Sequence, residues 1–586
     1  MATCLVFLFL VFFAFSANAY VNFDCGASDD YTDERNLAWT GDDGLFQNSQ
    51  AAVVQSRNTL PHVMSTLRVF TTRKKNCYSI SDVKGSLLLV RASFYYGNYD
   101  GKSSPPSFDM HFDGNEWATV QTSLDQLVNY EVVYASGSDT TSICLSQTQP
   151  NQFPFISALE VTELDSKMYS YLDPIHALFL RSRVAYGADA TVRYPDDYYD
   201  RIWDPATVGS GVTSVASDAS FISTANAPDN PPREVLQNAI TISSTSDYIM
   251  TELDTTQKRS FKAYVDNKPV SGPIIPPYGE VTEISINFTA SSNTSFLLIA
   301  DPDSTLPPLV NALEAFSISD RLTDGTNSKD VQGISELQKA FSDVLQDFWS
   351  GDPCLPSPYT WEWTTCSNDT IPRITALDLR SFNLSGELPD FSSMDALVTI
   401  NLQNNSITGP IPDFLGALPN LKELNLADNF FSGPVPPSLS SNKKLKLVVS
   451  GNPDLCVSSK SCQTTSTDGT TNSSSVPSGS RKKSSKLPVI LGTTIPIFVI
   501  FWALVGFLLH HKRKTAAIAA VTTGQTGGAN RPGGANRPGG ANNMTGKTGG
   551  AVINEIKVNF QDQTTTENGD QENPHEENGD QENPHQ

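Results

Sequence analysis

The sequence predicts a mainly β protein built from two tandem β-sandwich domains, a short solenoid of repeats, one membrane-spanning helix and a disordered tail. Short alternating apolar segments bounded by Gly, Pro, Asn and Asp fill residues 20–320 and indicate β-sandwiches. Glycines then recur at nearly equal spacing, at positions 386, 409 and 433, which indicates a solenoid. An uncharged apolar run, 487–509, is long enough to span a bilayer.

The segment 1–19 is typical of a secretory signal peptide. An apolar run from Cys4 to Phe15 precedes Ser16-Ala-Asn-Ala19, which has the Ala-x-Ala form of a cleavage site. The alternative of an uncleaved anchor is disfavoured because the run is short for a bilayer. We expect the mature chain to begin at Tyr20.

The second apolar run sets the predicted topology. Basic clusters flank it on both sides, at 481–483 and 512–514, so the positive-inside rule alone leaves the orientation open. The signal peptide places the N-terminal side outside. We therefore expect a single-pass type I protein of the plasma membrane, with an extracellular ectodomain, a Ser/Thr/Gly-rich stalk at 463–486, a transmembrane helix at 487–509 and a disordered, low-complexity cytoplasmic tail at 510–586.

Cysteines and glycosylation sequons agree with that orientation. The seven cysteines that follow the predicted signal peptide all precede the membrane span, as expected if the exterior is oxidising. The predicted N-glycosylation sites on the same side are Asn287, Asn293, Asn368, Asn383, Asn404 and Asn472. The pairing among Cys25, Cys77 and Cys144 stays open at this point.

The β-rich region divides into two similar halves. Pro154-Phe-Ile-Ser-Ala-Leu-Glu-Val, near the end of the first half, matches Pro308-Leu-Val-Asn-Ala-Leu-Glu-Ala, near the end of the second. We therefore expect two lobes of about the same size, over residues 20–168 and 169–320.

Several motifs in this region resemble the plant malectin-like domain in type and order. They are Asn22-Phe-Asp-Cys-Gly, Tyr31-Thr-Asp, Asn76-Cys-Tyr, Leu89-Val-Arg-Ala-Ser-Phe-Tyr-Tyr-Gly-Asn-Tyr-Asp, Phe108-Asp-Met, Arg193-Tyr-Pro-Asp-Asp, Asp200-Arg-Ile-Trp and Leu306-Pro-Pro-Leu-Val-Asn-Ala-Leu-Glu. The resemblance extends over both halves of the region. It implies two jelly-roll-like malectin-like lobes.

The next segment resembles plant leucine-rich repeats. Residues 321–373 contain a linker and Trp349-Ser-Gly-Asp-Pro-Cys354 with Trp361-Glu-Trp-Thr-Thr-Cys366, similar to the disulfide-closed N-terminal cap of those repeats. Three to four repeats follow over 374–462, with Asn405 and Asn429 at the position where an amide satisfies the turn backbone. Cys456 and Cys462 resemble a C-terminal cap, so we expect disulfides Cys354–Cys366 and Cys456–Cys462.

No catalytic constellation stands out. The segment from Thr515 to Gln586 is too short for a kinase fold and lacks its glycine-rich loop, lysine and aspartates. The ectodomain has no metal-spaced His cluster and no nucleophile elbow, and Asp196-Asp197 is interpreted as solvated surface rather than a hydrolase pair. The net charge of −23 disfavours nucleic acid as a partner. We expect no enzyme activity, no metal and no cofactor.

Two regions are candidate binding sites. Tyr95 and Tyr96 resemble an aromatic pair that contacts sugar in animal malectin, and Tyr31, Tyr99 and Asp100 are expected to join them. The alternative is that one of the pair packs in the core, since successive strand residues face opposite sides. On the repeats, the concave face is expected to present Asp378, Arg380, Asn401, Gln403 and Asn425, unless so short a solenoid is only a spacer.

The leading hypothesis is a plant receptor-like protein without its own kinase. It binds a cell-wall carbohydrate (an oligosaccharide) or a secreted peptide and acts through a co-receptor kinase in the same membrane. The alternative is a wall-anchoring, architectural membrane protein that binds carbohydrate and does not signal.

Overall fold

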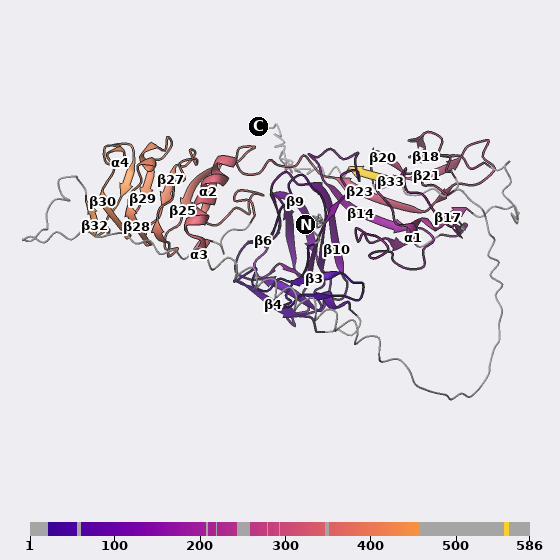
Figure 1. Cartoon of the computed structure of the whole chain (residues 1–586), viewed down its shortest axis with the longest axis horizontal. Helices are drawn as coiled ribbons and strands as arrows, with labels where there is room; N and C mark the ends of the chain where they lie inside the picture. The colour runs from indigo at the N-terminus through magenta and orange to yellow at the C-terminus, as the bar shows by residue number, and fades with distance from the viewer. Residues whose placement is uncertain are drawn as a thin grey trace, which may run out of the picture. The chain divides into compact units, whose positions relative to one another are not determined.

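The computed structural model describes residues 21–55, 60–206, 209–217, 219–242, 258–277, 279–291, 294–345 and 351–456, together with the backbone of 556–561 (Figure 1). Within these residues the fold is mainly β. No helix among them is long and apolar enough to cross a membrane. The predicted signal peptide, stalk and membrane span lie outside the described residues.

The described part of the first lobe contains thirteen strands around one large apolar core. They are β1 (Val21–Asp24), β2 (Tyr31–Thr32), β3 (Ala38–Gly41), β4 (Ser49–Val53), β5 (Thr66–Phe70), β6 (Lys75–Ser81), β7 (Leu87–Phe94), β8 (Ser107–Phe112), β9 (Asn115–Gln121), β10 (Val128–Ala135), β11 (Thr140–Ser146), β12 (Phe155–Ile156) and β13 (Ala158–Leu164), with the short 3-10 helix η1 (His62–Met64) between β4 and β5. The core lies between the sheet that contains β13, β7 and β10 and the sheet of order β6-β11-β8-β9.

The second lobe repeats this plan with shorter strands. Those that the structure describes are β14 (Leu178–Ala185), β15 (Asp204–Pro205), β16 (Val212–Ala216), β17 (Asn238–Ile242), β18 (Phe261–Val265), β19 (Lys268–Pro269), β20 (Ile284–Thr289), β21 (Phe296–Ala300), β22 (Leu309–Val310) and β23 (Ala312–Ile318), with a single-turn helix α1 (Arg233–Leu236). The apolar core of this lobe is smaller and centres on Phe261, Ile286 and Leu309.

One sheet runs through both lobes. β10 of the first lobe pairs antiparallel with β14 of the second, at Val132↔Phe179 and Val133↔Leu178. The order continues through β23 to β33 (Ile556–Gln561) and β20. β33 comes from the segment that the sequence predicts to be a disordered tail, so a strand at 556–561 differs from that expectation.

The repeats form a parallel solenoid (Figure 1). One sheet contains β24 (Thr364–Cys366), β25 (Ile374–Asp378), β27 (Thr399–Asn401), β29 (Glu423–Asn425) and β31 (Lys446–Val448), and a second contains β26 (Ser385–Glu387), β28 (Ser406–Pro410), β30 (Phe430–Pro434) and β32 (Asp454–Cys456). Short helical turns η3 (Asp413–Ala417) and α4 (Pro437–Ser440) connect the repeats, and α2 (Ser328–Ala340) and α3 (Ser342–Leu345) precede them. Leucines from successive repeats fill the interior.

Buried asparagine amides hold the turns of the solenoid together. Nδ2 of Asn405 donates to the carbonyl of Leu379 at 2.8 Å, and its Oδ1 accepts from the amide of Leu384 at 3.0 Å. Asn429 repeats the pattern one turn later with Leu402 and Ile407. Each side chain therefore satisfies backbone groups of two neighbouring repeats, as the sequence pattern predicted.

Candidate binding cleft between the two lobes

The predicted tyrosine pair lies largely inside the first lobe. Tyr95 and Tyr96 follow β7 and are 8% and 0% exposed. The Tyr96 hydroxyl donates to Asp100, and burial together with this carboxylate raises the pKa of Tyr96 to about 12. Tyr99 packs its ring on Tyr96 with centroids 5.3 Å apart. The structure thus brings Tyr96, Tyr99 and Asp100 together, but it places both members of the pair in the core.

Tyr31 makes its contacts elsewhere. Its hydroxyl donates to the buried Asp24 at 2.8 Å, and its ring meets that of His62 edge-on, with centroids 4.5 Å apart. His62 is in turn part of the wall of a small cleft between the lobes. Tyr31 therefore flanks this cleft.

The cleft has a volume of about 60 Å³ and is lined by polar and apolar side chains from both lobes. Its lining consists of Asp33, Glu34, Arg35, Trp39, Pro61, His62, Val63, Met64, Arg91, Ser93, Leu127, Asn129, Glu160, Arg193 and Ile202. The loop between β2 and β3 forms one wall. There Asp33 accepts from the backbone amides of Arg35 and Leu37, each at 2.9 Å, and from the Trp39 indole at 3.2 Å. This loop is therefore held in a defined shape before any ligand arrives.

Arg35 differs from the other arginines of the cleft. Its side chain is partly exposed, and no hydrogen bond or ion pair engages its guanidinium in the described part of the chain. Arg91 and Arg193, by contrast, are both paired with several carboxylates. Arg35 thus presents an open fork of donors to whatever enters the cleft.

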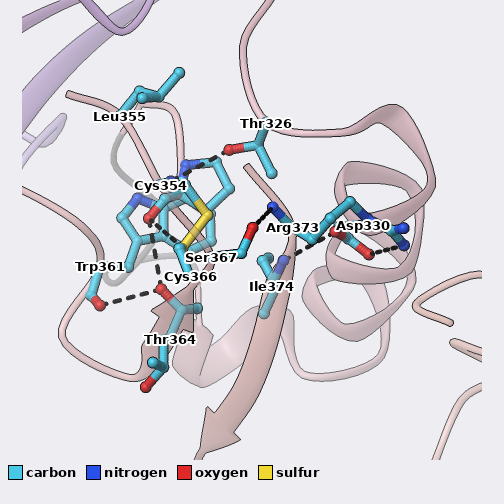
Figure 2. The surroundings of a disulfide bond; sticks show 12 residues. Thr326, Asp330, Cys354, Leu355, Trp361, Thr364, Cys366, Ser367, Arg373 and Ile374 are labelled. Atoms are coloured by element: carbon cyan, nitrogen blue, oxygen red, sulfur yellow. Dashed lines mark hydrogen bonds and ion pairs between the residues drawn. A yellow bond between two sulfur atoms is a disulfide. The ribbon is translucent and has the colours of Figure 1, made fainter. Parts of the chain in front are cut away.

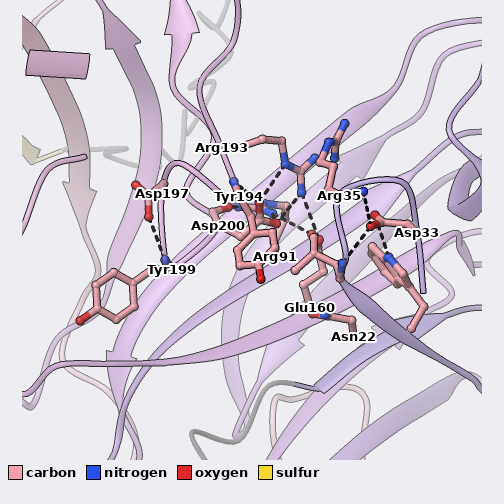
Figure 3. Close-up of polar contacts among 12 residues, drawn as sticks. Asn22, Asp33, Arg35, Arg91, Glu160, Arg193, Tyr194, Asp197, Tyr199 and Asp200 are labelled. Atoms are coloured by element: carbon pink, nitrogen blue, oxygen red, sulfur yellow. Dashed lines mark hydrogen bonds and ion pairs between the residues drawn. The ribbon is translucent and has the colours of Figure 1, made fainter. Parts of the chain in front are cut away.

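The floor of the cleft is a buried network of arginines and carboxylates (Figure 3). Arg91, from the middle of β7, is 2% exposed and pairs with Glu131 at 2.7 Å, Glu160 at 2.9 Å and Asp200 at 3.2 Å. Arg193 from the second lobe pairs with the same Asp200. The network therefore joins β7, β10 and β13 of lobe 1 to the 193–200 loop of lobe 2.

The acids of this network titrate differently according to their partners. Burial raises the pKa of Glu160 above its ordinary range and outweighs the attraction of Arg91. Burial also opposes ionisation of Glu131 and Asp200, but the arginines around them outweigh it and lower both pKa values. Glu160 is consequently the weakest acid of these three.

This buried network is not among the sites predicted from the sequence, although its residues lie in the motifs of the malectin-like resemblance. Leu89-Val-Arg and Arg193-Tyr-Pro-Asp-Asp with Asp200-Arg-Ile-Trp carry Arg91, Arg193 and Asp200. A charged residue inside a run of apolar strand residues, as at Arg91, was the available signal. Asp197 was assigned to solvated surface. That assignment is wrong, because Asp197 is 1% exposed and accepts from Arg201 at 2.9 Å and the Trp203 indole at 2.7 Å.

The repeat residues form a second polar surface. Nε of Arg380 donates to the two carboxylate oxygens of Asp378 at 2.9 and 3.0 Å, and the Asn425 amide donates to Gln403 at 3.1 Å. The backbone amide of Gln403 donates to the Asn401 side chain at 3.2 Å. All five lie at or just after β25, β27 and β29, so successive parallel strands display them on the same sheet.

The cap of the repeats is closed by the Cys354–Cys366 disulfide (Figure 2). Arg373 pairs with the fully buried Asp330 of α2 at 2.8 Å and so fastens this helix to the first repeat. In lobe 1, Cys77 and Cys144 form a second disulfide and Cys25 is a buried free thiol. Cys456 is disulfide-bonded, and its predicted partner Cys462 lies outside the described residues.

The predicted glycosylation sites that the structure describes are exposed. Asn287, Asn368, Asn383 and Asn404 all have exposed side chains, whereas Asn293 and Asn472 lie outside the described residues. Within the described ranges, no group of three His, Cys, Asp or Glu side chains has the geometry to hold a metal ion.

Comparisons with known proteins match both parts of this architecture. The malectin-like domain family model matches residues 23–318, and the leucine-rich repeat model matches 396–418 and 420–442. An uncharacterized Arabidopsis thaliana protein is 35% identical over 349 residues, which is 56% of this chain and 70% of that protein.

A probable LRR receptor-like serine/threonine-protein kinase of Arabidopsis thaliana is 32% identical over 418 residues, or 66% of this chain and 48% of the kinase. The chain thus spans about half the length of that receptor kinase. Among solved structures, the ANX2 ectodomain of Arabidopsis thaliana aligns with 51% of this chain and 96% of its own length, at 16% identity and a TM-score of 0.40.

Proposed function

This chain belongs to the malectin-like family, and from that premise we propose that it is a plant cell-surface receptor-like protein that binds a cell-wall oligosaccharide or a secreted peptide and acts through a partner receptor kinase. Its relatives include an LRR receptor-like serine/threonine-protein kinase that matches over 66% of this chain. The predicted signal peptide and membrane span support an extracellular position for the lobes and the repeats.

The observation that carries the proposal is the Arg35 guanidinium in the cleft between the lobes, which no described side chain or backbone group engages. Arginine donates through a planar fork, which suits a carboxylate or a pair of neighbouring hydroxyls. His62, whose side chain is 61% exposed, supplies ring surface in the same cleft. These are the groups that recognise a sugar ring or a peptide carboxylate.

The tyrosine patch, which consists of Tyr95, Tyr96, Tyr99 and Asp100, remains a second proposed contact site. Tyr99 and Asp100 are partly exposed, whereas Tyr95 and Tyr96 are buried. Replacing the buried pair would disturb the core as well as a ligand, so Tyr99 and Asp100 are the residues to change. We also propose that the residues on the concave face of the repeats contact the partner kinase. These residues are Asp378, Arg380, Asn401, Gln403 and Asn425.

A glycan and peptide array probed with the secreted ectodomain, residues 20–480, tests the function. We expect a saturable ligand whose affinity falls at least about tenfold in Arg35→Ala, since a charged hydrogen bond is worth about 1.5–3 kcal/mol. The exposed Arg233→Ala serves as the matched control and leaves affinity unchanged. Loss of affinity in Tyr99→Ala/Asp100→Ala instead would move the site to the tyrosine patch.

Deleting residues 515–586 separates signalling from anchoring. If the protein signals through a partner kinase that its tail helps to hold, the deletion lowers co-precipitation of that kinase while ligand binding persists. Unchanged recruitment and output would favour the architectural role.

A further inference from the structure

One face of the sheet β6-β11-β8-β9 in lobe 1 points away from the apolar core of the lobe. Met110 and Phe112 of β8 fill that core, and strand residues alternate between two faces, so His111 lies on the opposite, outer face. Cys144 of β11 is paired in the ladder with His111 on one side and with Cys77 of β6 on the other. The Cys77–Cys144 disulfide and His111 therefore form a row across the outer face.

The cap of the repeats covers this outer face. Gly351 lies directly over the disulfide, where an added methyl group would be 2.7 Å from each of the two sulfur atoms. Nζ of Lys75 donates to two carbonyl oxygens of the cap, at 2.7 and 3.0 Å. The Tyr359 hydroxyl of the cap donates to Asp109 of β8 at 2.9 Å. Water can also satisfy these polar groups, so the two surfaces can separate without exposing a large apolar core.

His111 is a buried group of this contact that has no hydrogen-bond partner. It is 2% exposed, and within the described residues neither of its ring nitrogens makes a hydrogen bond. Its ring lies against the ring of Tyr359, with centroids 5.2 Å apart. A protonated imidazole carries a charge and two donors, and here it would find neither an acceptor nor water. Protonation of His111 therefore destabilises the closed contact.

We propose that the contact between lobe 1 and the cap of the repeats is a pH-sensitive switch, which is closed at neutral pH and opens as acid protonates His111. In the open form the imidazole lies on a solvated sheet face, where water hydrates its charge. In the closed form the cap excludes that water. The proposal concerns the joint between two parts of the ectodomain and does not depend on which ligand the protein binds.

The charges around His111 leave burial as the dominant influence on its protonation. Burial lowers the pKa of His111 to about 4, against the attraction of Asp109 on β8 and with a smaller contribution in the same direction from the Lys75 ammonium on β6. Glu116 of β9 stands opposite His111 in the ladder and is exposed. Burial and the hydrogen bond to Asp109 raise the pKa of Tyr359 to about 12, so the cap side of the contact stays neutral at this ring.

The other titratable groups at the joint do not open it in acid. Burial lowers the pKa of Lys75 to about 8, so its ammonium stays protonated in both forms between pH 5 and pH 7. The Asp352 carboxylate accepts hydrogen bonds from Thr326 and from the cap itself, and these stay in place when the cap separates from lobe 1. Burial raises the pKa of Asp113 to about 6, and this shift has the opposite sign, because acid then favours the form in which Asp113 is buried.

The size of the effect follows from the pKa of His111 in the two forms. An exposed imidazole titrates at about pH 6.5, whereas burial under the cap lowers the pKa to about 4. The open form therefore binds the proton more tightly. The stability of the closed form is fully present above about pH 6.5 and is lost as the pH falls toward about 4. Between pH 7 and pH 5, the equilibrium constant for closing is expected to fall about 20-fold.

Hydrogen exchange of the full-length protein in detergent micelles, resolved at single amides, tests the proposal. The reporter is the backbone amide of Thr323, which precedes the repeats and donates to the Asn115 side chain of lobe 1 at 2.7 Å. After correction for the intrinsic exchange rate, we expect its protection factor to be about 20-fold lower at pH 5 than at pH 7. The control is the amide of Val132 in β10, which lies between two paired strands and is expected to change by less than about 3-fold.

Two results in the wild-type protein would overturn the proposal. One is a change at Thr323 of less than about 3-fold, and the other is an equal loss of protection at Val132, which would mean that the lobe unfolds as a whole. Because this comparison needs no variant, a substitution that prevents folding does not remove the test.

The variant His111→Gln provides a second measurement. It keeps a polar side chain on the outer face but cannot take up a proton, so protection at Thr323 is expected to change by less than about 3-fold between pH 7 and pH 5. A pH response in His111→Gln as large as that of the wild type would assign the opening to another group and overturn the proposal.

Discussion

Replacing Arg91 by methionine perturbs the buried network that joins the two lobes. The change keeps most of the side-chain volume and removes the charge. Three carboxylates then lose a partner, but unequally. Glu131 keeps Arg183 at 2.6 Å, and Asp200 keeps Arg193. Among the described cations, Glu160 keeps only Arg193 at 3.5 Å, so most of the loss falls on Glu160.

The magnitude follows from leaving one buried carboxylate poorly paired. Removing one partner of a buried ion pair costs about 3–5 kcal/mol. For the malectin-like region of about 300 residues, this corresponds to a decrease in the melting temperature of about 5–8 °C. Thermal unfolding of the secreted ectodomain, followed by circular dichroism at pH 7, measures it. The double variant Arg91→Met/Glu160→Gln removes the stranded charge too, and we expect it to recover at least about 1 kcal/mol of the loss.

The pH dependence tests the cause. Without Arg91, the folded-state pKa of Glu160 rises further above its unfolded value. A carboxyl group whose pKa is raised by folding lowers the free energy of unfolding of the protein as pH rises from its unfolded pKa to its folded pKa. The stability deficit of Arg91→Met relative to the wild type is therefore largest at pH 7 and shrinks toward pH 5. A deficit under about 1 kcal/mol, or one that does not change with pH, would refute the assignment of Arg91 as the charge partner of Glu160.

Three further predictions concern the repeats and their junction with lobe 1. Asn429→Ala leaves buried backbone groups of two repeats without partners and is expected to lower the free energy of unfolding, measured by urea denaturation, by about 2–3 kcal/mol. Lys443→Ala, at an exposed position of the repeats, is the control and changes stability by less than about 0.5 kcal/mol. Cys354→Ser removes the cap disulfide and is expected to lower the free energy of unfolding by about 2–4 kcal/mol. The melting temperature of the variant falls accordingly, and reductant no longer lowers it further through this bond. The buried Lys75 donates to the carbonyls of Asp352 and Leu355, and burial lowers its pKa to about 8. The unfolded chain therefore binds the Lys75 proton more tightly than the folded protein does. The contribution of Lys75 to the free energy of unfolding rises between about pH 8 and pH 10.5, by up to about 3 kcal/mol. A series of unfolding curves measured at different pH values checks this, because Lys75→Met abolishes the rise.

The parts of this fold that could be predicted from the sequence are those set by local sequence patterns. The amide ladder of Asn405 and Asn429 depends on a repeat whose period is visible in the chain, and each amide bonds backbone groups one repeat away. The cap disulfide joins cysteines only 12 positions apart. The duplicated Ala-Leu-Glu motif lies in β13 and β23, which occupy the same place in the two lobes.

The candidate site depended on contacts between distant segments, which no local pattern records. Tyr95 and Tyr96 directly follow β7, and strand alternation predicts that they face opposite sides. Both are nevertheless buried, and the following loop folds back so that the Ser104 amide donates to the Tyr96 hydroxyl. Arg91 meets Asp200 from 109 positions away, and Arg35 meets the cleft only after lobe 2 supplies Arg193. Burial of a charge is a property of the assembled lobes.

β10 of lobe 1 and β14 of lobe 2 pair with each other, so a continuous sheet rather than a hinge joins the two lobes. A clamshell receptor reports its ligand by closing, and the closure moves whatever is attached to each half. Here a shared ladder of hydrogen bonds and the Arg91 network oppose such a rotation. If a ligand binds in the cleft as proposed, the walls are already in position and the protein loses little entropy in ordering them. Its arrival would be read by a partner as a new composite surface, formed of ligand and protein together, rather than as a change in the shape of the protein.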